Sequence, residues 1–240
     1  CGIDVTKDTL DCSYNNEEGA EKHLQVKKKK KGFRQLFKTC GKRTYVMECS
    51  GPYYLCLALW LKEKGCSVCA ENALVIKRFI QMNKERNKND RADAKWIFRY
   101  SQQCETREWK IPERAQVECQ QILSGIRNYN RQRNMLLNQL HSIESLPWQS
   151  AEMKHSIKQM IKKAGAEIEK LQQTLEEKIK VWMPGQSEIL QSIPGLGKRA
   201  AAMLIVFTSG FEKVENYRQL ISLAGLNPVE RTSGTSIRSK

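Results

Sequence analysis

Two acidic residues occupy strand-like segments where a carboxylate needs an explanation. Asp4 lies between Ile3 and Val5, in a segment typical of a β-strand, where aspartate is disfavoured. Glu48 ends the mostly apolar segment 44–49, and α/β sheets bind ligands at the carboxyl ends of their strands. Each acid could bind a metal ion, but each taken singly is also explained as a solvent-facing residue at a strand end.

A second acidic pair follows in the segment Asp90-Arg91-Ala92-Asp93. A spacing of three places both carboxylates on one face of a helix, where like charges repel unless a cation lies between them. A hard divalent cation with oxygen ligands meets that need. The alternative is helix capping, in which Asp90 binds free backbone N–H groups and Asp93 interacts favourably with the helix dipole.

The four acids together are more informative than either pair. A carboxylate in the first strand, one at the end of a later strand and two on a helix predict an acidic tetrad of Asp4, Glu48, Asp90 and Asp93. Such carboxylates hold two divalent ions roughly 3.5–4 Å apart for in-line phosphoryl displacement, one ion activating the nucleophile and the other neutralising the leaving oxygen. The expected cofactor is Mg²⁺, or Mn²⁺ in its place.

The charge balance indicates a polyanionic partner. The 240 residues carry 41 Lys and Arg against 26 Asp and Glu, a formal charge of +15. Cations that neutralise phosphates release condensed counterions, so a nucleic acid fits this surplus better than a basic protein with no such target. Lys28, Lys29 and Lys30, within a run of five lysines, are candidate phosphate contacts, although a solvated turn explains them equally well.

The elements that would position these residues fall into three parts. Strand and helix patterns alternate over residues 1–110, which predicts an α/β domain with a central sheet. Residues 111–183 contain two long helical patterns, 113–145 and 150–182, which predict a helical hairpin or coiled-coil arm that dimerises through its apolar seam. Residues 184–240 form a small, mostly helical unit. We expect the strands of Asp4 and Glu48 to be adjacent, with the Asp90 helix crossing above them.

The third part carries a glycine-rich loop, Pro194-Gly195-Leu196-Gly197-Lys198. Its glycines let backbone N–H groups approach a phosphate, and the start of the following helix favours an anion. The loop is similar to the hairpin of helix-hairpin-helix DNA binders, which makes Gly195, Gly197 and Lys198 candidate nucleic-acid contacts. A tight connection between two packed helices is the equally good alternative.

Cysteine usage and hydropathy indicate the compartment. The nine cysteines lack a regular disulfide framework, which is typical of a reducing cytoplasm. No apolar run approaches the ~20 residues of a membrane span.

Several motifs together resemble one family, the DEDD transposases of bridge-RNA-guided insertion sequences, to which the Piv-type invertases are related. The resemblance spans nearly the whole chain. It rests on Gly-Ile-Asp-Val at 2–5, Glu-Cys-Ser-Gly-Pro-Tyr at 48–53, Lys-Asn-Asp-Arg-Ala-Asp-Ala at 88–94, Ile-Pro-Gly-Leu-Gly at 193–197, Ala-Gly-Leu-Asn-Pro at 224–228 and Ser-Gly at 233–234.

The resemblance implies an RNase H/RuvC-like first domain, with the acidic tetrad as its metal ligands and Arg91 as a further nucleic-acid contact. It also implies that a serine of the C-terminal transposase domain attacks DNA and holds it covalently. Ser233 matches that position; Ser236 stays an alternative, as does a reading of both as loop residues. The implied partners are donor and target DNA, a structured guide RNA, and further copies of the chain in a dimer or tetramer. The implied location is the prokaryotic cytoplasm, at the nucleoid.

One departure from the family concerns the end of the chain. The family's C-terminal domain continues with a basic segment of which Ser239-Lys240 looks like the beginning, so we expect this domain to be incomplete; both ends of the chain look cut. Two other functions stay open: a RuvC-like endonuclease that only hydrolyses DNA, and a non-catalytic nucleic-acid-binding fragment.

Overall fold

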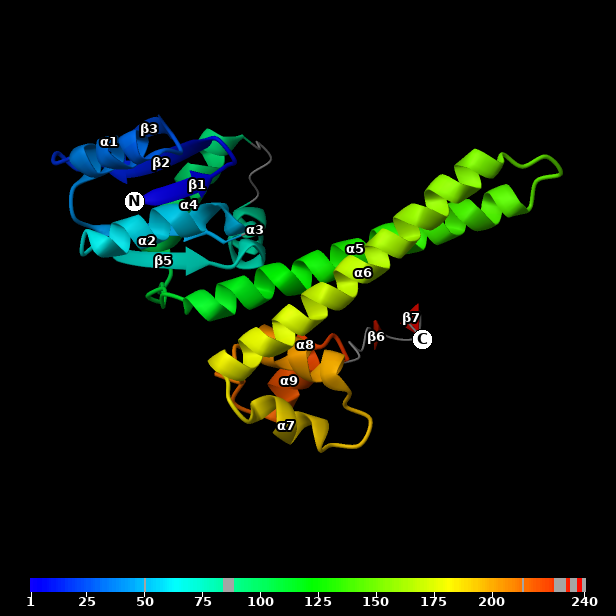
Figure 1. Ribbon diagram of the computed structural model, residues 1–240. Coiled ribbons are helices and arrows are strands. Elements are labelled where there is room, and N and C mark those ends of the chain that lie inside the picture. Colours follow the sequence, from blue (N-terminus) through cyan, green and yellow to red (C-terminus); the bar gives the residue numbers. More distant parts are fainter. Residues whose placement is uncertain (50, 84–88, 213, 227–231, 234–236, 239–240) are drawn as a thin grey trace. The chain divides into compact units, whose positions relative to one another are not determined.

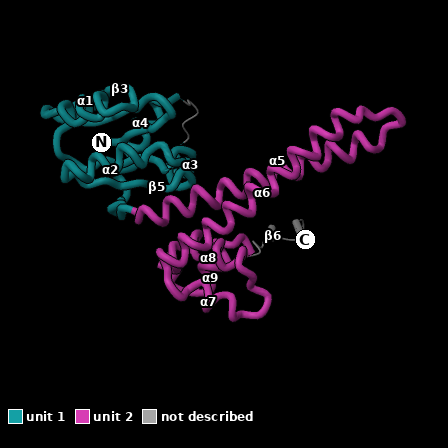
Figure 2. The backbone as a smooth tube through the Cα atoms, in the orientation of Figure 1, with its two compact units in different colours: residues 1–111 teal, residues 112–240 magenta. Residues whose placement is uncertain are grey.

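The computed structural model describes residues 1–49, 51–83, 89–212, 214–226, 232–233 and 237–238. The chain divides into two compact units, residues 1–111 and 112–240, which are coloured separately in Figure 2. Unit 1 contains a mixed sheet covered by helices, and unit 2 is largely helical (Figure 1).

The sheet of unit 1 has five strands in the order β3-β2-β1-β4-β5. Strands β1, β2 and β3 are antiparallel neighbours, whereas β1, β4 and β5 run parallel. The strands are β1 (Gly2–Val5), β2 (Thr9–Asn15), β3 (Glu21–Lys27), β4 (Thr44–Glu48) and β5 (Ser67–Glu71). The pairing of β1 with β4 confirms that the strands of Asp4 and Glu48 are adjacent.

In the described part of unit 1, four helices and one 3₁₀ turn accompany this sheet. They are α1 (Lys30–Cys40), η1 (Pro52–Tyr54), α2 (Leu55–Glu63), α3 (Ala73–Met82) and α4 (Asp90–Gln103). The lysine run is not a turn throughout, because α1 begins inside it. The backbone N–H of Phe33 donates to the Lys29 carbonyl oxygen at 3.0 Å, which makes Lys30 the first helical residue.

The two faces of the sheet belong to different cores, as the period-two alternation of strands requires. Ile3, Met47 and Val68 pack with apolar residues of α1 and α2. Their chain neighbours Val46 and Cys69 face the opposite way and pack with α3 and α4. The sheet therefore lies between two helical layers, and every second residue of β1 and β4 faces α4.

Unit 2 is built on two long helices that lie side by side along much of their length (Figure 1). They are α5 (Arg114–Glu144) and α6 (Ala151–Trp182), followed by α7 (Gln186–Gln191), α8 (Lys198–Thr208), α9 (Tyr217–Leu223) and the short antiparallel strands β6 (Thr232–Ser233) and β7 (Ile237–Arg238). The two long helical patterns are thus confirmed to within a residue at each end.

One apolar core joins the long helices to α8. Leu123 and Ile126 of α5, Leu175 of α6, and Ala201 and Ile205 of α8 are buried together. Residues 112–240 therefore pack as one unit, and the boundary at residue 184 stays a prediction. Among the helices that the structure describes, none combines the length and hydrophobicity that crossing a bilayer requires.

Candidate active site

Strand register sets Asp4 beside Glu48. Gly2 lies opposite Val46, and Ile3 lies opposite Met47, on the parallel strands β1 and β4. The same offset continued by one residue places Asp4 level with Glu48, at the carboxyl ends of both strands. Because Val46 faces α4 and side chains alternate, Asp4 and Glu48 share that face of the sheet.

Helix α4 brings the second acidic pair to the same place. A Cβ atom added to Gly2 would collide with the backbone nitrogen of Phe98 and would lie 2.7 Å from the carbonyl oxygen of Ala94. The helix backbone therefore rests directly on the start of β1, as predicted for a helix crossing above this strand. The first turn of α4, which holds Asp90 and Asp93, lies before that contact.

The charges of the other three acids act on Asp4. The pKa of Asp4 is raised from 3.8 to about 7, mostly by burial and then by the negative charges of Asp90, Asp93 and Glu48, in that order. Like charges act in this way only over short distances, since exposed charges further apart than a Debye length are screened. The Asp4 carboxyl is therefore near enough to the other three acids for their charges to raise its pKa.

The capping alternative for Asp90 does not hold. Asn89 is the N-cap residue of α4, and its Oδ1 accepts a hydrogen bond from the backbone N–H of Ala92 at 2.8 Å. Asp90 and Asp93 lie in the first turn, after the cap, where the helix dipole still favours negative charge. A capping role therefore does not account for Asp90.

The tetrad fits divalent ions by the chemistry of its donors. Four carboxylates offer only oxygen ligands, which Mg²⁺ and Mn²⁺ prefer. Within the described ranges, no three acidic, histidine or cysteine side chains already stand at the spacing of a shared ion. Mutual repulsion holds like charges apart, so we expect an ion to draw these carboxylates inward.

A fifth acid that the sequence analysis missed lies next to the tetrad. Asp11 pairs with Asp4 across β1 and β2, and its side chain is only 2% exposed. Gln25 Nε2 donates to both of its carboxylate oxygens, at 3.0 and 3.2 Å, and His23 Nε2 lies 3.0 Å from Oδ1. Since the carboxylate only accepts, this nitrogen of His23 carries the proton. The available signal was the same as for Asp4, namely an aspartate between apolar strand residues.

The lysine run contributes one cation at the edge of the tetrad. Lys28 Nζ donates to the carbonyl oxygen of Thr6, directly after β1, at 2.9 Å. The same ammonium lies 4.1 Å from the centre of the Tyr53 ring, in η1 after β4. Lys29 and Lys30 are exposed at the start of α1. Lys28 therefore lies where β1 ends, next to the segment that follows β4.

Arg91 is also on α4, but it lines a pocket that does not include the four acids. It is exposed and lines a polar pocket of about 210 Å³ together with Lys95, Lys22 and His23. Lys95 Nζ lies 3.8 Å from Glu21 Oε1 in the same pocket. Three cations on this side of α4 suit a phosphate backbone.

The glycine-rich loop forms a tight turn in unit 2. Leu196 N–H donates to the Ile193 carbonyl oxygen at 3.0 Å, and Gly195 has φ = +87°, as the third residue of a type II turn requires. Gly197 is the N-cap residue of α8 and supplies no side-chain cap, so N–H groups of the first turn point outward. Lys198 Nζ lies 3.5 Å from Glu176 Oε2.

The expected nucleophile is only partly described. The backbone of Ser233 belongs to β6 and pairs with Ile237. Its side chain, and all of Ser236, lie outside the described residues. The role of either serine therefore stays a prediction.

Comparisons with known proteins match this chain to transposase families and to gene-inverting proteins. Residues 1–143 match the profile of a DEDD-type family described as transposase. Residues 187–240 match the profile of the transposase IS116/IS110/IS902 family. The chain is also 23% identical, over 248 aligned residues, to the pilin gene-inverting proteins of Moraxella bovis and Moraxella lacunata. Each alignment covers 100% of this chain and 75% of the relative.

Proposed function

The chain belongs to the IS116/IS110/IS902 family of transposases, and from this premise we propose that it cuts and rejoins DNA with its acidic tetrad as the ligands of divalent ions. The enzyme class, a DNA transposase or recombinase, follows from the family. The ions proposed are Mg²⁺ or Mn²⁺. The proposal is supported by the strand register that sets Asp4 level with Glu48, and by the charges of Asp90, Asp93 and Glu48 that raise the pKa of Asp4.

The chain's own residues would act mainly by position. Gly2 lets α4 lie against β1, which holds the helical pair above the strand pair. Bound divalent ions supply charge stabilisation at the attacking and leaving oxygens of a phosphoryl transfer. Asp11 is hydrogen-bonded to His23 and Gln25. It would therefore add negative charge without being free to rotate toward the ions.

We further propose Ser233 as the nucleophile, with Ser236 as the alternative. The serine oxygen forms a phosphodiester bond to one DNA end while the other end leaves with the displaced oxygen. A hydroxyl of the partner strand then attacks that phosphodiester and releases the serine. The support is the resemblance of the segment around residues 233–234 to the family's C-terminal domain.

The partners and architecture complete the proposal. We propose an RNase H/RuvC-like first domain, supported by the sheet order and by the antiparallel β1, β2 and β3 beside the parallel β4 and β5. The α5–α6 pair would be a coiled-coil arm that joins copies into a dimer or tetramer. A structured guide RNA would select donor and target DNA in the prokaryotic cytoplasm, at the nucleoid.

The proposed phosphate contacts lie in both units. Lys28, Lys29 and Lys30 and Arg91 would serve unit 1, and the Gly195–Lys198 loop would serve unit 2. We expect binding that weakens steeply as salt rises, because each phosphate contact releases counterions. Equal affinity at low and high salt would contradict this assignment.

The central test compares Asp4→Asn with Asp8→Asn. Asp8 is an exposed aspartate in the turn after β1, so the control removes the same charge nearby. We expect Asp4→Asn to lower Mn²⁺ affinity in calorimetry and Mg²⁺-dependent strand cleavage, each by at least about a hundredfold. Asp8→Asn should change neither. Wild-type Mn²⁺ binding in the Asp4 variant would remove the metal-site proposal.

The nucleophile is tested separately by trapping protein–DNA adducts on denaturing gels. Ser233→Ala should abolish the adduct, and Ser236→Ala should retain it. The reverse result would assign Ser236. Cleavage by the wild-type protein without any adduct would instead support a hydrolytic endonuclease.

A further inference from the structure

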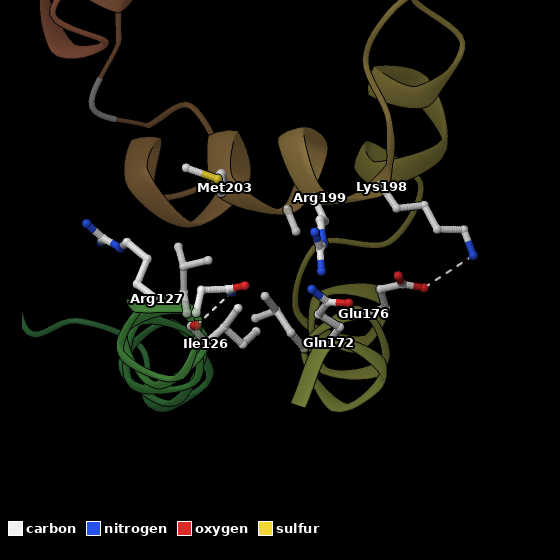
Figure 3. Close-up of a pocket in the computed structure, with 11 residues that line it drawn as sticks. Ile126, Arg127, Gln172, Glu176, Lys198, Arg199 and Met203 are labelled. Carbon is white, nitrogen blue, oxygen red and sulfur yellow. Dashed lines mark hydrogen bonds and ion pairs between the residues drawn. The ribbon is translucent and has the colours of Figure 1, made fainter. Parts of the chain in front are cut away.

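Unit 2 contains a pocket that the proposed strand-transfer chemistry does not use (Figure 3). Its volume is about 230 Å³, and it lies between α5, α6 and α8. The apolar part of its lining comes from all three helices: Leu123, Ile126, Leu175, Ala202 and Met203. This is smaller than the roughly 300–1,000 Å³ of sites for drug-sized ligands, and suits a single planar ring.

Cations surround this apolar lining. Lys198 and Arg199 come from the first turn of α8, and Arg127 comes from α5. The one acid of the lining, Glu176, is paired with Lys198. Arg199 points from α8 into the space between the two long helices, as Figure 3 shows. Among the described residues, neither arginine forms an ion pair, so the rim has a surplus of positive charge.

Two details indicate what a ligand must offer. The guanidinium of Arg127 lies 5.1 Å from the centre of the exposed Phe207 ring, so it is held in place while remaining accessible. Gln172 lines the pocket, and its Nε2 is buried without a hydrogen-bond partner in the described part of the chain. A buried donor of this kind needs an acceptor.

We propose that this pocket receives one unpaired base of a DNA strand. The apolar lining would hold the ring, and Gln172 would donate to a carbonyl oxygen or ring nitrogen on its edge. Arg127, Arg199 and the first turn of α8 would bind the flanking phosphates. The inference rests on the proposed action on DNA, but not on the metal site in unit 1.

Charge and shape favour DNA over the other occupants of such a pocket. An acidic peptide would match the rim but offers no planar ring for the lining. A second copy of this basic chain would bring further positive charge against the rim. DNA supplies phosphates, a flat apolar face and edge acceptors in one molecule.

The test measures binding of the full chain in EDTA to short single strands of equal length and charge. One strand carries deoxyuridine at every position, one is abasic throughout, and one carries ribouridine. We expect the wild-type protein to prefer the deoxyuridine strand over the abasic strand by about tenfold, the order that a stacked base contributes. Using identical units throughout prevents the strand from shifting to another base.

Two variants locate that preference. Ala202→Leu fills the pocket, and Gln172→Leu keeps the side-chain size while removing the donor. Both should reduce the preference for bases and leave binding to the abasic strand unchanged. Arg199→Gln should weaken both strands alike, whereas Arg133→Gln, an exposed matched control on α5 outside the lining, should have less effect. Gln172→Leu keeps the test decisive if Ala202→Leu fails to fold.

The proposal is overturned if the wild-type protein binds base-bearing and abasic strands equally, or if Gln172→Leu keeps the full preference. It is also overturned if polyglutamate of equal charge competes as well as the deoxyuridine strand. The assignment to DNA is overturned if the variants lose as much affinity for the ribouridine strand as for the deoxyuridine strand, or more. Asp4→Asn should retain the base preference, so failure of the metal site is distinguishable.

Discussion

The two units arrange charge around their candidate sites in opposite ways. In unit 1 two acids at strand ends, Asp4 and Glu48, and two in the first turn of α4, Asp90 and Asp93, carry like charge; burial together with this charge raises the pKa of Asp4 to about 7. In unit 2 three cations stand at the exposed rim of an apolar pocket. Partly buried like charges destabilise the fold until a counterion arrives, whereas rim charges cost little in water. The first site should therefore appear in stability measurements, and the second in salt-dependent binding.

The largest effect on the difference between the two units is expected from the Gly2→Ala substitution. The added Cβ would collide with the backbone of α4, which cannot move aside as a flexible side chain would. We expect a loss of about 3 kcal/mol in the free energy of unfolding, at the upper end of overpacking costs, together with loss of Mn²⁺ binding.

The matched change is Gly165→Ala on α6, where an added Cβ meets no other atom. This variant should gain roughly 0.5–1 kcal/mol from helix propensity. Urea unfolding measures both. If the Gly2→Ala protein has wild-type stability and still binds Mn²⁺, the close approach of α4 does not position the tetrad.

The next effect is the pH dependence caused by Asp4. Its folded pKa of about 7 lies above the usual 3.8, so the folded protein keeps a proton that the unfolded chain has lost. The contribution of Asp4 to stability should therefore be greatest below about pH 4, fall as the pH rises to about 7, and level off above that. We expect a fall of about 2 kcal/mol, less than the full shift implies because water screens a partly exposed group.

Asp4→Asn should flatten this slope and raise the unfolding temperature at pH 8. Mg²⁺ should stabilise the wild-type protein at that pH but not the variant, since only a bound ion shifts the unfolding equilibrium. Asp8→Asn should behave like the wild-type protein. A slope that survives in Asp4→Asn would assign the titration to another group.

A smaller effect is expected at the neighbouring Asp11. His23→Ala removes one partner of a buried carboxylate and leaves Gln25 as the other. We expect a loss of about 1–2 kcal/mol in thermal unfolding. Lys22→Ala, an exposed neighbour on β3, should stay within about 0.5 kcal/mol. Equal effects of the two changes would mean that the His23 contact adds no stability.

The smallest expected effect on stability comes from the ion pair at the pocket of unit 2, and it tests the role of charge there. Glu176→Gln removes the exposed ion pair with Lys198, which contributes less than about 1 kcal/mol. Affinity for single-stranded DNA at low salt should rise, because the only acid of the pocket lining is gone. Glu177→Gln removes an exposed charge one residue away and should change affinity less. Filter binding at two salt concentrations distinguishes them.

Local signals explain which parts of the fold were predictable. The helical pattern of α4 follows from the period of Ala94 and Ile97, although its capping residue is Asn89 and not Asp90. The adjacency of β1 and β4 follows from alternating strand and helix patterns. Lysine is among the better helix formers, but no capping side chain precedes Lys30, so no local signal marks where α1 begins.

Long-range pairing explains what the sequence did not reveal. Asp11 meets His23 and Gln25 only because β2 and β3 pair in one register, which no local pattern encodes. The pocket of unit 2 arises where α8 packs beside α5 and α6. In the sequence, Leu123 and Leu175 have the pattern of ordinary core residues. Nothing in their spacing distinguishes the lining of a pocket from a filled core.

The length of α5 has a mechanical consequence. Its 31 residues span about 46 Å at 1.5 Å per residue, and its first half shares a core with α8. A tilt of about 5° at that core would carry the far end of α5, about 27 Å beyond Ile126, through about 2 Å. Packing around Ala201 and Ile205 therefore bears on where the far end of α5 lies.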